Sequence, residues 1–238
     1  MTTLPRIGVL LPVSFTTTPS LDRQRAAVQR LEHAGYGMAW TNEVIGKDAL
    51  VQVAVLLAAT RRMMFGTSIA NIWARPAPTM SAAAAELAQA YPGRFVLGLG
   101  VGYPQQAEAV GRPFGSPLAT MRDYVHQMDA PTQPPAPSAE YPRLIAANGP
   151  KMLALAAELA DGALPAGQPV SGTVAARQAL GPRKLLVVGA SAEGAPLEHL
   201  AAGADHVLVM LERGIDYDAG IDQLERLAPA LLRTESPR

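Results

Sequence analysis

The chain has 238 residues, 49% of them hydrophobic, and this length and composition suit one α/β domain over residues 1–238. Twenty basic and twenty acidic residues give a formal net charge of zero, which argues against nucleic acid or an anionic membrane as a partner. The lack of cysteine excludes disulfides, thiolate metal sites and a cysteine nucleophile. Because the first residues resemble no signal peptide and no apolar run is long enough to span a bilayer, we expect a cytoplasmic protein.

Patterns typical of strands and of helices alternate along the whole chain. Short apolar runs predict strands at 7–11, 37–41, 63–69, 95–100, 144–147, 162–164, 185–188 and 206–210. Capping residues and apolar residues at helical spacing predict helices at 20–34, from 48 to 59, from 76 or 78 to 91, and at 118–128, 151–160, 173–180, 197–202 and 221–231. Loops are expected at 131–137 and 165–172.

Eight strands alternating with helices predict an α/β fold of the (β/α)8 TIM-barrel type. The alternative is a doubly wound open sheet, whose glycine fingerprint normally follows the first strand. Here the glycine-rich turn follows the fourth strand, which favours the barrel. The short proline-rich loop at 131–137 lies inside the repeating pattern, so it does not mark a boundary between domains.

A Gly-x-Gly-x-Gly turn at 98–102 follows the fourth predicted strand directly. Glycines at such a place let backbone N–H groups approach a bound group closely, typically a phosphate. The alternative is a turn that only packs a helix against the strand. The sequence around the turn, Arg94 to Tyr103, leaves both interpretations open.

Several segments together resemble one protein family. They are GYGMAW at 35–40, LLAAT at 56–60, FGTSI at 65–69, YPGRFVLGLGVG at 91–102, IAANGPKM at 145–152, ADGA at 160–163 and GADHV at 203–207. Their order and spacing resemble the luciferase-like monooxygenases, in particular the branch that uses the deazaflavin coenzyme F-420. The match is almost continuous over 5–165 and then continues in pieces. It implies a barrel that holds F-420, or alternatively FMN, at the carboxyl ends of its strands.

The resemblance also implies which residues bind the cofactor. In the family the third strand ends in a bulge with a non-prolyl cis peptide behind the ring, and the matching bond here is Ser68–Ile69, followed by Ala70. An ordinary strand end is the alternative. The implied phosphate site combines two turns, formed by Gly100, Val101, Gly102 and Tyr103 and by Asn148, Gly149 and Pro150. Free N–H groups at a helix N-terminus favour an anion, although the second turn is also a plain helix start.

Candidates for catalysis are few. Asn42 and Glu43 stand where relatives carry an acidic residue and often a histidine, so Glu43 is expected to exchange a proton beside the ring. The alternative is a surface or helix-start carboxylate. Tyr103 stands where some relatives have a catalytic glutamate, and tyrosine is a poor acid at pH 7. Trp73 is a candidate pocket wall or core residue, and Arg75 either meets a coenzyme anion or is solvated.

The four histidines show no metal-ligand spacing, so no metal site is predicted. His206 reads as a strand-end residue, and His33, His126 and His199 as surface residues. No nucleophile elbow or Ser-His-Asp spacing is present either.

Family members are commonly longer, and the shortfall here follows Gly162, so we expect a barrel shortened in its C-terminal half with an open cofactor face. The leading hypothesis is hydride transfer between F-420 and a small organic substrate. An FMN-dependent monooxygenase and a non-catalytic flavin-binding or degenerate barrel are the alternatives. The resemblance also implies a homodimer, paired through the segments 51–57 and 82–85.

Overall fold

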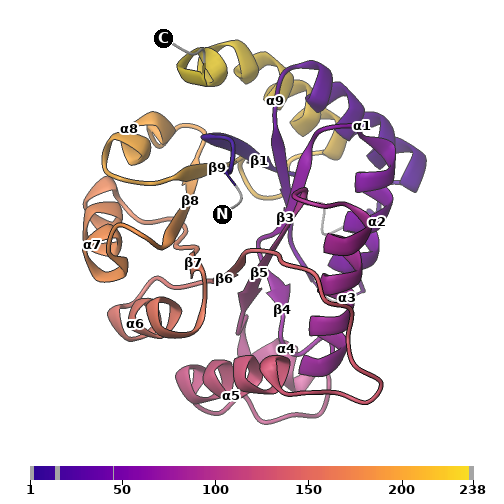
Figure 1. Cartoon of the computed structure of the whole chain (residues 1–238). Coiled ribbons are helices and arrows are strands. Elements are labelled where there is room, and N and C mark those ends of the chain that lie inside the picture. The colour runs from indigo at the N-terminus through magenta and orange to yellow at the C-terminus, as the bar shows by residue number, and fades with distance from the viewer. Residues whose placement is uncertain (1–2, 14–16, 45, 236–238) are drawn as a thin grey trace.

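The computed structural model of the chain describes residues 3–13, 17–44 and 46–235 (Figure 1). The strands are β1 (Ile7–Leu10), β2 (Met38–Thr41), β3 (Met64–Thr67), β4 (Ala70–Asn71), β5 (Phe95–Gly100), β6 (Arg143–Ile145), β7 (Gly162–Ala163), β8 (Leu185–Ser191) and β9 (His206–Met210). The helices are α1 (Leu21–His33), α2 (Ala49–Ala59), α3 (Ala77–Ala90), α4 (Pro104–Glu108), α5 (Pro117–Asp129), α6 (Pro150–Leu159), α7 (Val170–Leu180), α8 (Pro196–Ala201) and α9 (Tyr217–Leu231), followed by a 3-10 turn at Leu232–Glu235.

The described strands form one closed parallel barrel. β1 pairs with β2 on one side and with β9 on the other, which closes the sheet. β3 and β4 both pair with β5, so these two short strands together fill one of the eight places. Figure 1 shows the helices as a ring around the strands. The (β/α)8 barrel is therefore confirmed, and the open sheet is excluded by the β1–β9 pairing.

Two apolar layers hold the barrel together, one inside the strands and one between the strands and the helices. The inner layer contains Met38, Trp40, Val96, Val187 and Leu208, all fully buried. Each alternates along its strand with residues of the outer layer, because successive side chains of a strand point to opposite faces. Short runs without charge are the pattern of strands that are covered on both faces, which is why the sequence predicted them.

His206 lies inside the barrel at its amino-terminal end, since it is the first residue of β9. Its Nε2 accepts a hydrogen bond from Trp40 Nε1 at 2.9 Å, and its Nδ1 faces the carbonyl of Pro5. Burial lowers the pKa of His206 to about 4. The strand-end placement is confirmed, but this end lies opposite the one where a TIM barrel carries its active site.

The structure corrects four details of the sequence interpretation. The strand predicted at 63–69 stops at Thr67 and resumes as β4 after a two-residue break. The helix α4 was not predicted, because five residues are too few for a periodic pattern. α7 begins at Val170, inside the segment predicted as loop. His199 is buried, not at the surface, where its Nδ1 lies 2.7 Å from the hydroxyl of Thr173.

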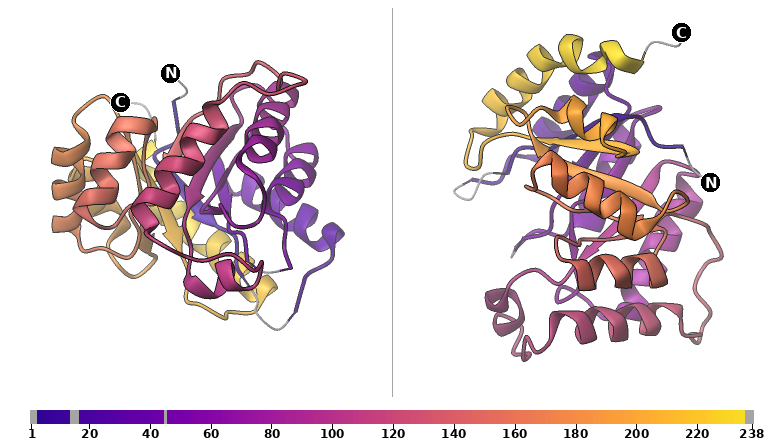
Figure 2. Two further views of the ribbon diagram at one scale, coloured as in Figure 1. Left: turned by 90° about the horizontal axis from the view of Figure 1, so that it is seen from below. Right: turned by 90° about the vertical axis from the view of Figure 1, so that its left-hand side faces the viewer.

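The carboxyl ends of the strands gather at one end of the barrel. In the left view of Figure 2, α4 and the connection from β9 to α9 lie at this end, whereas the segment 130–142 crosses the opposite end. No helix of the described residues has both the length and the apolar composition to cross a membrane.

Candidate functional site

The break between β3 and β4 forms a bulge at the carboxyl end of the barrel. The peptide bond Ser68–Ile69 is cis, as the family resemblance implied. The neighbouring strand fixes the bulge, because Ser68 N donates to Thr41 O at 2.7 Å and Glu43 N donates to Ile69 O at 3.0 Å. Ser68 and Ile69 are half-buried and Ala70 is buried, so the first two form part of the accessible barrel mouth.

Two glycines of β5 make room for this bulge. A Cβ at Gly100 would lie 2.5 Å from Ile69 Cγ1, and a Cβ at Gly98 would lie 2.1 Å from the Thr67 carbonyl oxygen. The Thr67 hydroxyl donates to Gly98 O and accepts from Gly98 N, at 2.8 and 2.9 Å, so it replaces a backbone pairing between the strands. These glycines therefore serve the close approach of β3 and the bulge to β5.

The turn after β5 is already capped by protein atoms. Gly102 has φ +63°, and Gln106 Oε1 accepts from Tyr103 N at 2.9 Å. The carbonyl of the buried Val101 accepts from Trp73 Nε1 at 2.6 Å. Tyr103 is 64% exposed. The backbone N–H of Tyr103 was expected to face a phosphate, but it already donates to the side chain of Gln106.

The second turn, between β6 and α6, is open. Asn148, Gly149 and Pro150 are exposed, and no heavy atom lies within 4 Å of a Cβ built on Gly149. Asn148 Oδ1 accepts from Ala166 N at 2.9 Å, which holds the turn in place. Because β5 and β6 are paired neighbours, this turn and the turn after β5 lie at the same end of the barrel.

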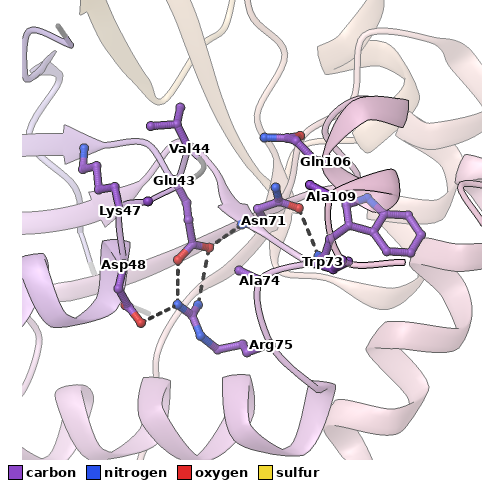
Figure 3. Close-up of a pocket in the computed structure, with 12 residues that line it drawn as sticks. Glu43, Val44, Lys47, Asp48, Asn71, Trp73, Ala74, Arg75, Gln106 and Ala109 are labelled. Carbon is purple, nitrogen blue, oxygen red and sulfur yellow. Dashed lines mark hydrogen bonds and ion pairs between the residues drawn. The ribbon is translucent and has the colours of Figure 1, made fainter. Parts of the chain in front are cut away.

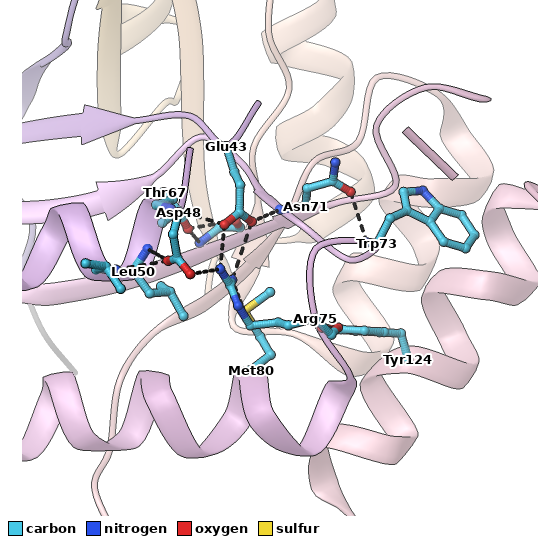
Figure 4. A network of polar contacts seen from close by, with 12 residues as sticks. Glu43, Asp48, Leu50, Thr67, Asn71, Trp73, Arg75, Met80 and Tyr124 are labelled. Atoms are coloured by element: carbon cyan, nitrogen blue, oxygen red, sulfur yellow. Dashed lines mark hydrogen bonds and ion pairs between the residues drawn. The ribbon is translucent and has the colours of Figure 1, made fainter. Parts of the chain in front are cut away.

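Glu43 is buried just beyond β2, and its carboxylate is surrounded by donors (Figure 4). Oε1 accepts from Arg75 Nη2 at 2.6 Å and from Ala49 N at 3.1 Å. Oε2 accepts from Asn71 N at 2.7 Å and, at 3.4 Å, from Arg75 Nη1. The backbone N–H of Glu43 also donates to Ile69 O, so Glu43 makes hydrogen bonds to both ends of the bulge and to the start of α2.

Arg75 is enclosed by two carboxylates. Its Nη2 lies 2.6 Å from Glu43 and 3.0 Å from Asp48, and only 10% of its side chain is exposed. Burial acts to lower its pKa, but the charges and hydrogen bonds of Glu43 and Asp48 outweigh burial and raise it. Its backbone carbonyl accepts from Tyr124 OH at 2.9 Å. The solvated interpretation of Arg75 is wrong, because its guanidinium is buried against two protein carboxylates. Contact with a coenzyme anion stays a prediction.

Asn42 takes part in a different set of contacts. Its Oδ1 accepts from Lys47 Nζ at 3.1 Å, and Thr41 Oγ1 accepts from the same ammonium at 2.7 Å. Burial lowers the pKa of Lys47 to about 8, and the nearby charge of Glu43 opposes this shift.

A cavity of about 290 Å³ opens between these two sets of contacts and α4 (Figure 3). It is bounded by the segment after β2, the segment after β4 and the helix α4 with the residues after it. The lining residues are Glu43, Val44, Gly46, Lys47, Asp48, Asn71, Trp73, Ala74, Arg75, Gln106, Ala109 and Val110. Trp73 thus lines a pocket, as one of its two interpretations proposed.

The structure brings together more polar residues than the sequence singled out. Glu43, Asn42, Trp73 and Arg75 were candidates, whereas Lys47, Asp48 and Gln106 were not named as site residues. The only signal for Lys47 and Asp48 was their position directly after a predicted strand and its two candidates, at the start of a predicted helix.

Comparisons with known proteins agree with this geometry. The family profile described as luciferase-like monooxygenase matches residues 5–184. A Mycobacterium tuberculosis protein assigned as a coenzyme F-420-dependent oxidoreductase is 32% identical over 170 residues, which cover 58% of this chain and 49% of that protein. The 5,10-methylenetetrahydromethanopterin reductase of Methanolobus tindarius is 28% identical over 151 residues, covering 56% and 46% respectively. The chain thus spans about half the length of these curated relatives.

Two solved structures show the same fold. One is an F-420-dependent secondary alcohol dehydrogenase in complex with an F-420–acetone adduct. It matches with a TM-score of 0.78 at 15% identity, and the match covers 97% of this chain and 99% of the dehydrogenase chain. The oxygenating constituent of 3,6-diketocamphane monooxygenase from Pseudomonas putida, in complex with FMN, has a TM-score of 0.62 at 14% identity, covering 80% and 67%.

Proposed function

Since the chain belongs to the luciferase-like monooxygenase family, we propose that it is an oxidoreductase that transfers a hydride between coenzyme F-420 and a small organic substrate. One observation carries the proposal: the bulge between β3 and β4, at Ser68 and Ile69, and the open turn at Asn148, Gly149 and Pro150 lie at the same end of one barrel. A planar ring and an anionic tail are two parts of one such coenzyme.

The residues at the barrel mouth fit this group. Gly149 leaves open space at the start of the ten-residue helix α6, where free N–H groups favour an anion. Ser68, Ile69 and Ala70 would lie behind the ring. The turn after β5, from Gly100 to Tyr103, is proposed to lie beside the α6 turn at the anionic tail. When bound, the deazaflavin supplies the hydride chemistry, and the protein supplies position and the anion site.

We propose that Glu43 acts first as a positioning residue for the bulge. Four hydrogen bonds to its carboxylate and one from its N–H leave it engaged with Arg75, Asn71, Ala49 and Ile69. Proton exchange by Glu43, with Asn42 beside it, stays a prediction. Glu43→Gln separates the two roles: loss of a proton donor changes the pH profile of turnover, whereas loss of positioning weakens cofactor binding at every pH.

FMN is the alternative cofactor, favoured by the FMN complex among the structures of the same fold. Titration of the purified protein with F-420 and with FMN, followed by absorbance and fluorescence, distinguishes the two. Binding of F-420 alone supports the proposal, and binding of FMN alone supports a monooxygenase. Binding of neither cofactor would contradict both and favour a non-catalytic barrel.

A matched pair of variants tests the anion site. Gly149→Val fills the open space at the start of α6, and we expect it to weaken cofactor binding by about tenfold or more, as for the loss of one hydrogen bond to a charged group. Ala154→Val adds comparable bulk to an exposed position of the same helix and should leave affinity unchanged. Equal cofactor affinities of the two variants would show that the start of α6 does not contribute to cofactor binding.

We also propose that the chain forms a homodimer through α2 and α3. The outer face of α2 is apolar, with Val51 62% exposed and Ala58 exposed beside it. On α3, Ala82 and Ala83 are half-buried and present little bulk, which allows close approach of a second helix pair.

A further inference from the structure

Two carboxamide side chains, those of Asn71 and Gln106, offer unused hydrogen-bond donors at the cavity. Asn71 lies in β4, directly after the bulge, and Gln106 lies on α4, beyond β5. We propose that their two NH2 groups bind the carbonyl oxygen of a small uncharged compound, and that such carbonyl compounds are the substrate class. This step rests on the proposed function, because it names the substrate of that reaction.

Backbone contacts fix the orientation of both carboxamides. Asn71 Oδ1 accepts from Trp73 N at 3.0 Å, and Gln106 Oε1 accepts from Tyr103 N at 2.9 Å. A carboxamide turned over would set its NH2 group against a backbone N–H, so each oxygen is held on the side of the backbone. Neither NH2 group donates to another atom in the described part of the chain, so both keep their donors for a ligand.

The two carboxamides lie side by side at the cavity. A Cβ built on Gly102 would lie 1.9 Å from Gln106 Oε1 and 3.7 Å from Asn71 Nδ2, so both side chains lie beside the same point. Figure 3 shows the nitrogen of Gln106 directed from α4 toward Val44, and the nitrogen of Asn71 directed toward Gln106. One acceptor atom placed between the two nitrogens can therefore receive a hydrogen bond from each.

The Nδ2 atom of Asn71 is open to the cavity, although the residue is only 5% exposed. In the described part of the chain, the fully enclosed side-chain atoms without a hydrogen-bond partner are Arg143 Nε and Tyr217 OH. Asn71 Nδ2 also lacks a partner but is not one of these enclosed atoms, so a ligand can reach it. Since both carboxamides are held in position before binding, little entropy is lost when an acceptor arrives.

The rest of the cavity favours an uncharged ligand. Its lining contains two cations, Lys47 and Arg75, and two carboxylates, Glu43 and Asp48, so its formal charge is zero. Arg75 pairs with both carboxylates. The volume of about 290 Å³ lies at the lower limit of ordinary ligand pockets, which suits a compact molecule better than a deazaflavin with its tail. Other parts of the wall are apolar, formed by Val44, Trp73, Ala109 and Val110.

A pair of donors selects a group that only accepts hydrogen bonds. A carbonyl oxygen has two lone pairs and no hydrogen, whereas a hydroxyl or an amine brings donors that need partners of their own. Reduction of the carbonyl adds a hydride to its carbon and a proton from solvent to its oxygen, which yields an alcohol. That hydride comes from the reduced form of the proposed coenzyme, which is thereby oxidised. Because negative charge grows on the oxygen in this step, donors fixed beside it stabilise the transition state.

The test uses the purified apoprotein with cyclohexanone as the probe. Methylenecyclohexane, which carries CH2 in place of the carbonyl oxygen, is the matched compound without an acceptor. Binding is followed by ¹⁵N–¹H NMR of the side-chain NH2 signals. The chain contains three asparagines, Asn42, Asn71 and Asn148, so the Asn71 signal is assigned by its loss in Asn71→Asp. The loss of a signal in Gln106→Glu assigns the second NH2 group.

The same two variants test the contribution of each donor. Asn71→Asp and Gln106→Glu remove an NH2 group but keep the oxygen that accepts from the backbone. Gln105→Glu is the control, because it adds the same charge at an exposed neighbour on α4 that does not line the cavity. Backbone amide spectra check that each variant is folded, and Gln106→Glu, at a half-buried position, tests the pair independently of Asn71.

Cyclohexanone should shift both NH2 signals in a saturable manner. Asn71→Asp and Gln106→Glu should each weaken its binding by about fivefold or more, the loss expected for one hydrogen bond, whereas Gln105→Glu should bind like wild type. Methylenecyclohexane should not distinguish wild type from either variant. No shift of the two signals into the millimolar range, equal cyclohexanone affinity in wild type and Gln106→Glu, or an equal loss of methylenecyclohexane binding would overturn the proposal.

A cofactor titration of the same samples separates this proposal from the proposed function. Cyclohexanone binding that depends on Gln106 in a protein that binds neither F-420 nor FMN would support the carbonyl site and contradict the redox function. Cofactor binding together with cyclohexanone binding that ignores Asn71 and Gln106 would support the redox function and contradict the carbonyl site. If F-420 shifted both NH2 signals and cyclohexanone shifted neither, the donors would belong to the ring carbonyls of the coenzyme, which would overturn the proposed substrate class.

Discussion

The ion pair of Arg75 and Glu43 holds the bulge and the start of α2 in one unit, so removing Arg75 should destabilise the barrel mouth. Arg75→Met keeps most of the side-chain volume but leaves the Glu43 carboxylate buried without its cation. The Glu43 side chain is 2% exposed, so water cannot replace the guanidinium without opening the site. Two backbone N–H groups, those of Asn71 and Ala49, would still donate to the carboxylate.

The expected magnitude follows from this geometry. Breaking a buried ion pair by removing one partner costs about 3–5 kcal/mol, because an uncompensated charge remains. The two remaining N–H donors place this case at the lower end, about 3 kcal/mol. For a chain of this length, that corresponds to a fall in Tm of about 6–12 °C. Replacing Glu43 with Gln in the Arg75→Met background removes the stranded charge and should recover about 1 kcal/mol or more.

The assay is thermal and urea unfolding followed by circular dichroism, with Arg122→Met as control. Arg122 also pairs with a carboxylate through two contacts, to Glu158 at 2.6 and 2.8 Å, but both side chains are solvent-exposed. Exposed pairs add little to stability, so this control should unfold like wild type. If Arg75→Met were as stable as Arg122→Met, or the double variant less stable than Arg75→Met alone, the buried pair would not hold the bulge as described.

Three further predictions concern parts of the molecule outside this ion pair. The pKa of His206 is 6.5 in the unfolded chain and about 4 in the folded protein, so the unfolded state binds a proton first as the pH falls. The free energy of unfolding, measured by urea titration, should therefore drop by about 3 kcal/mol between pH 6.5 and pH 4. His206→Gln should reduce this dependence of the free energy on pH. Gly98→Ala sets a Cβ 2.1 Å from the Thr67 carbonyl oxygen and should lose about 1–3 kcal/mol or fail to fold, whereas Gly149→Ala meets nothing within 4 Å and should keep the wild-type Tm; equal Tm values would refute the steric argument. Val51→Glu places a charge on the outer face of α2 and should convert a dimer to a monomer by light scattering, while a monomeric wild type would refute the dimer itself.

The barrel was predictable because its signals are local. Apolar runs of four to six residues, such as Phe95–Gly100, are recognisable without knowing their neighbours, and so is Ser20 as the cap of α1, which accepts from Arg23 N. β7 has only two residues, Gly162 and Ala163, and was still predicted because it falls where the alternation of strand and helix requires one.

The contacts of the site were not predictable in the same way, because they depend on side chains far apart in sequence. Glu43 and Arg75 are separated by 32 positions, and nothing near either residue indicates the other. Gln106 is a similar case: it caps the turn after β5 only because α4, which was too short to predict, turns back on that strand end.

The glycine-rich turn after β5 illustrates how one pattern serves two purposes. The sequence allowed either a phosphate site or close packing, and Gly98 and Gly100 are occupied by packing, since Thr67 and Ile69 fill the space a Cβ would need. In the other predicted phosphate turn, Gly149 has open space around it. If the proposed coenzyme binds, its anionic end is therefore expected to depend on the α6 turn, while the β5 glycines act indirectly by allowing the bulge to lie against the barrel. A variant at Gly149 should therefore change the affinity for the coenzyme, whereas a variant at Gly98 should change the stability of the fold.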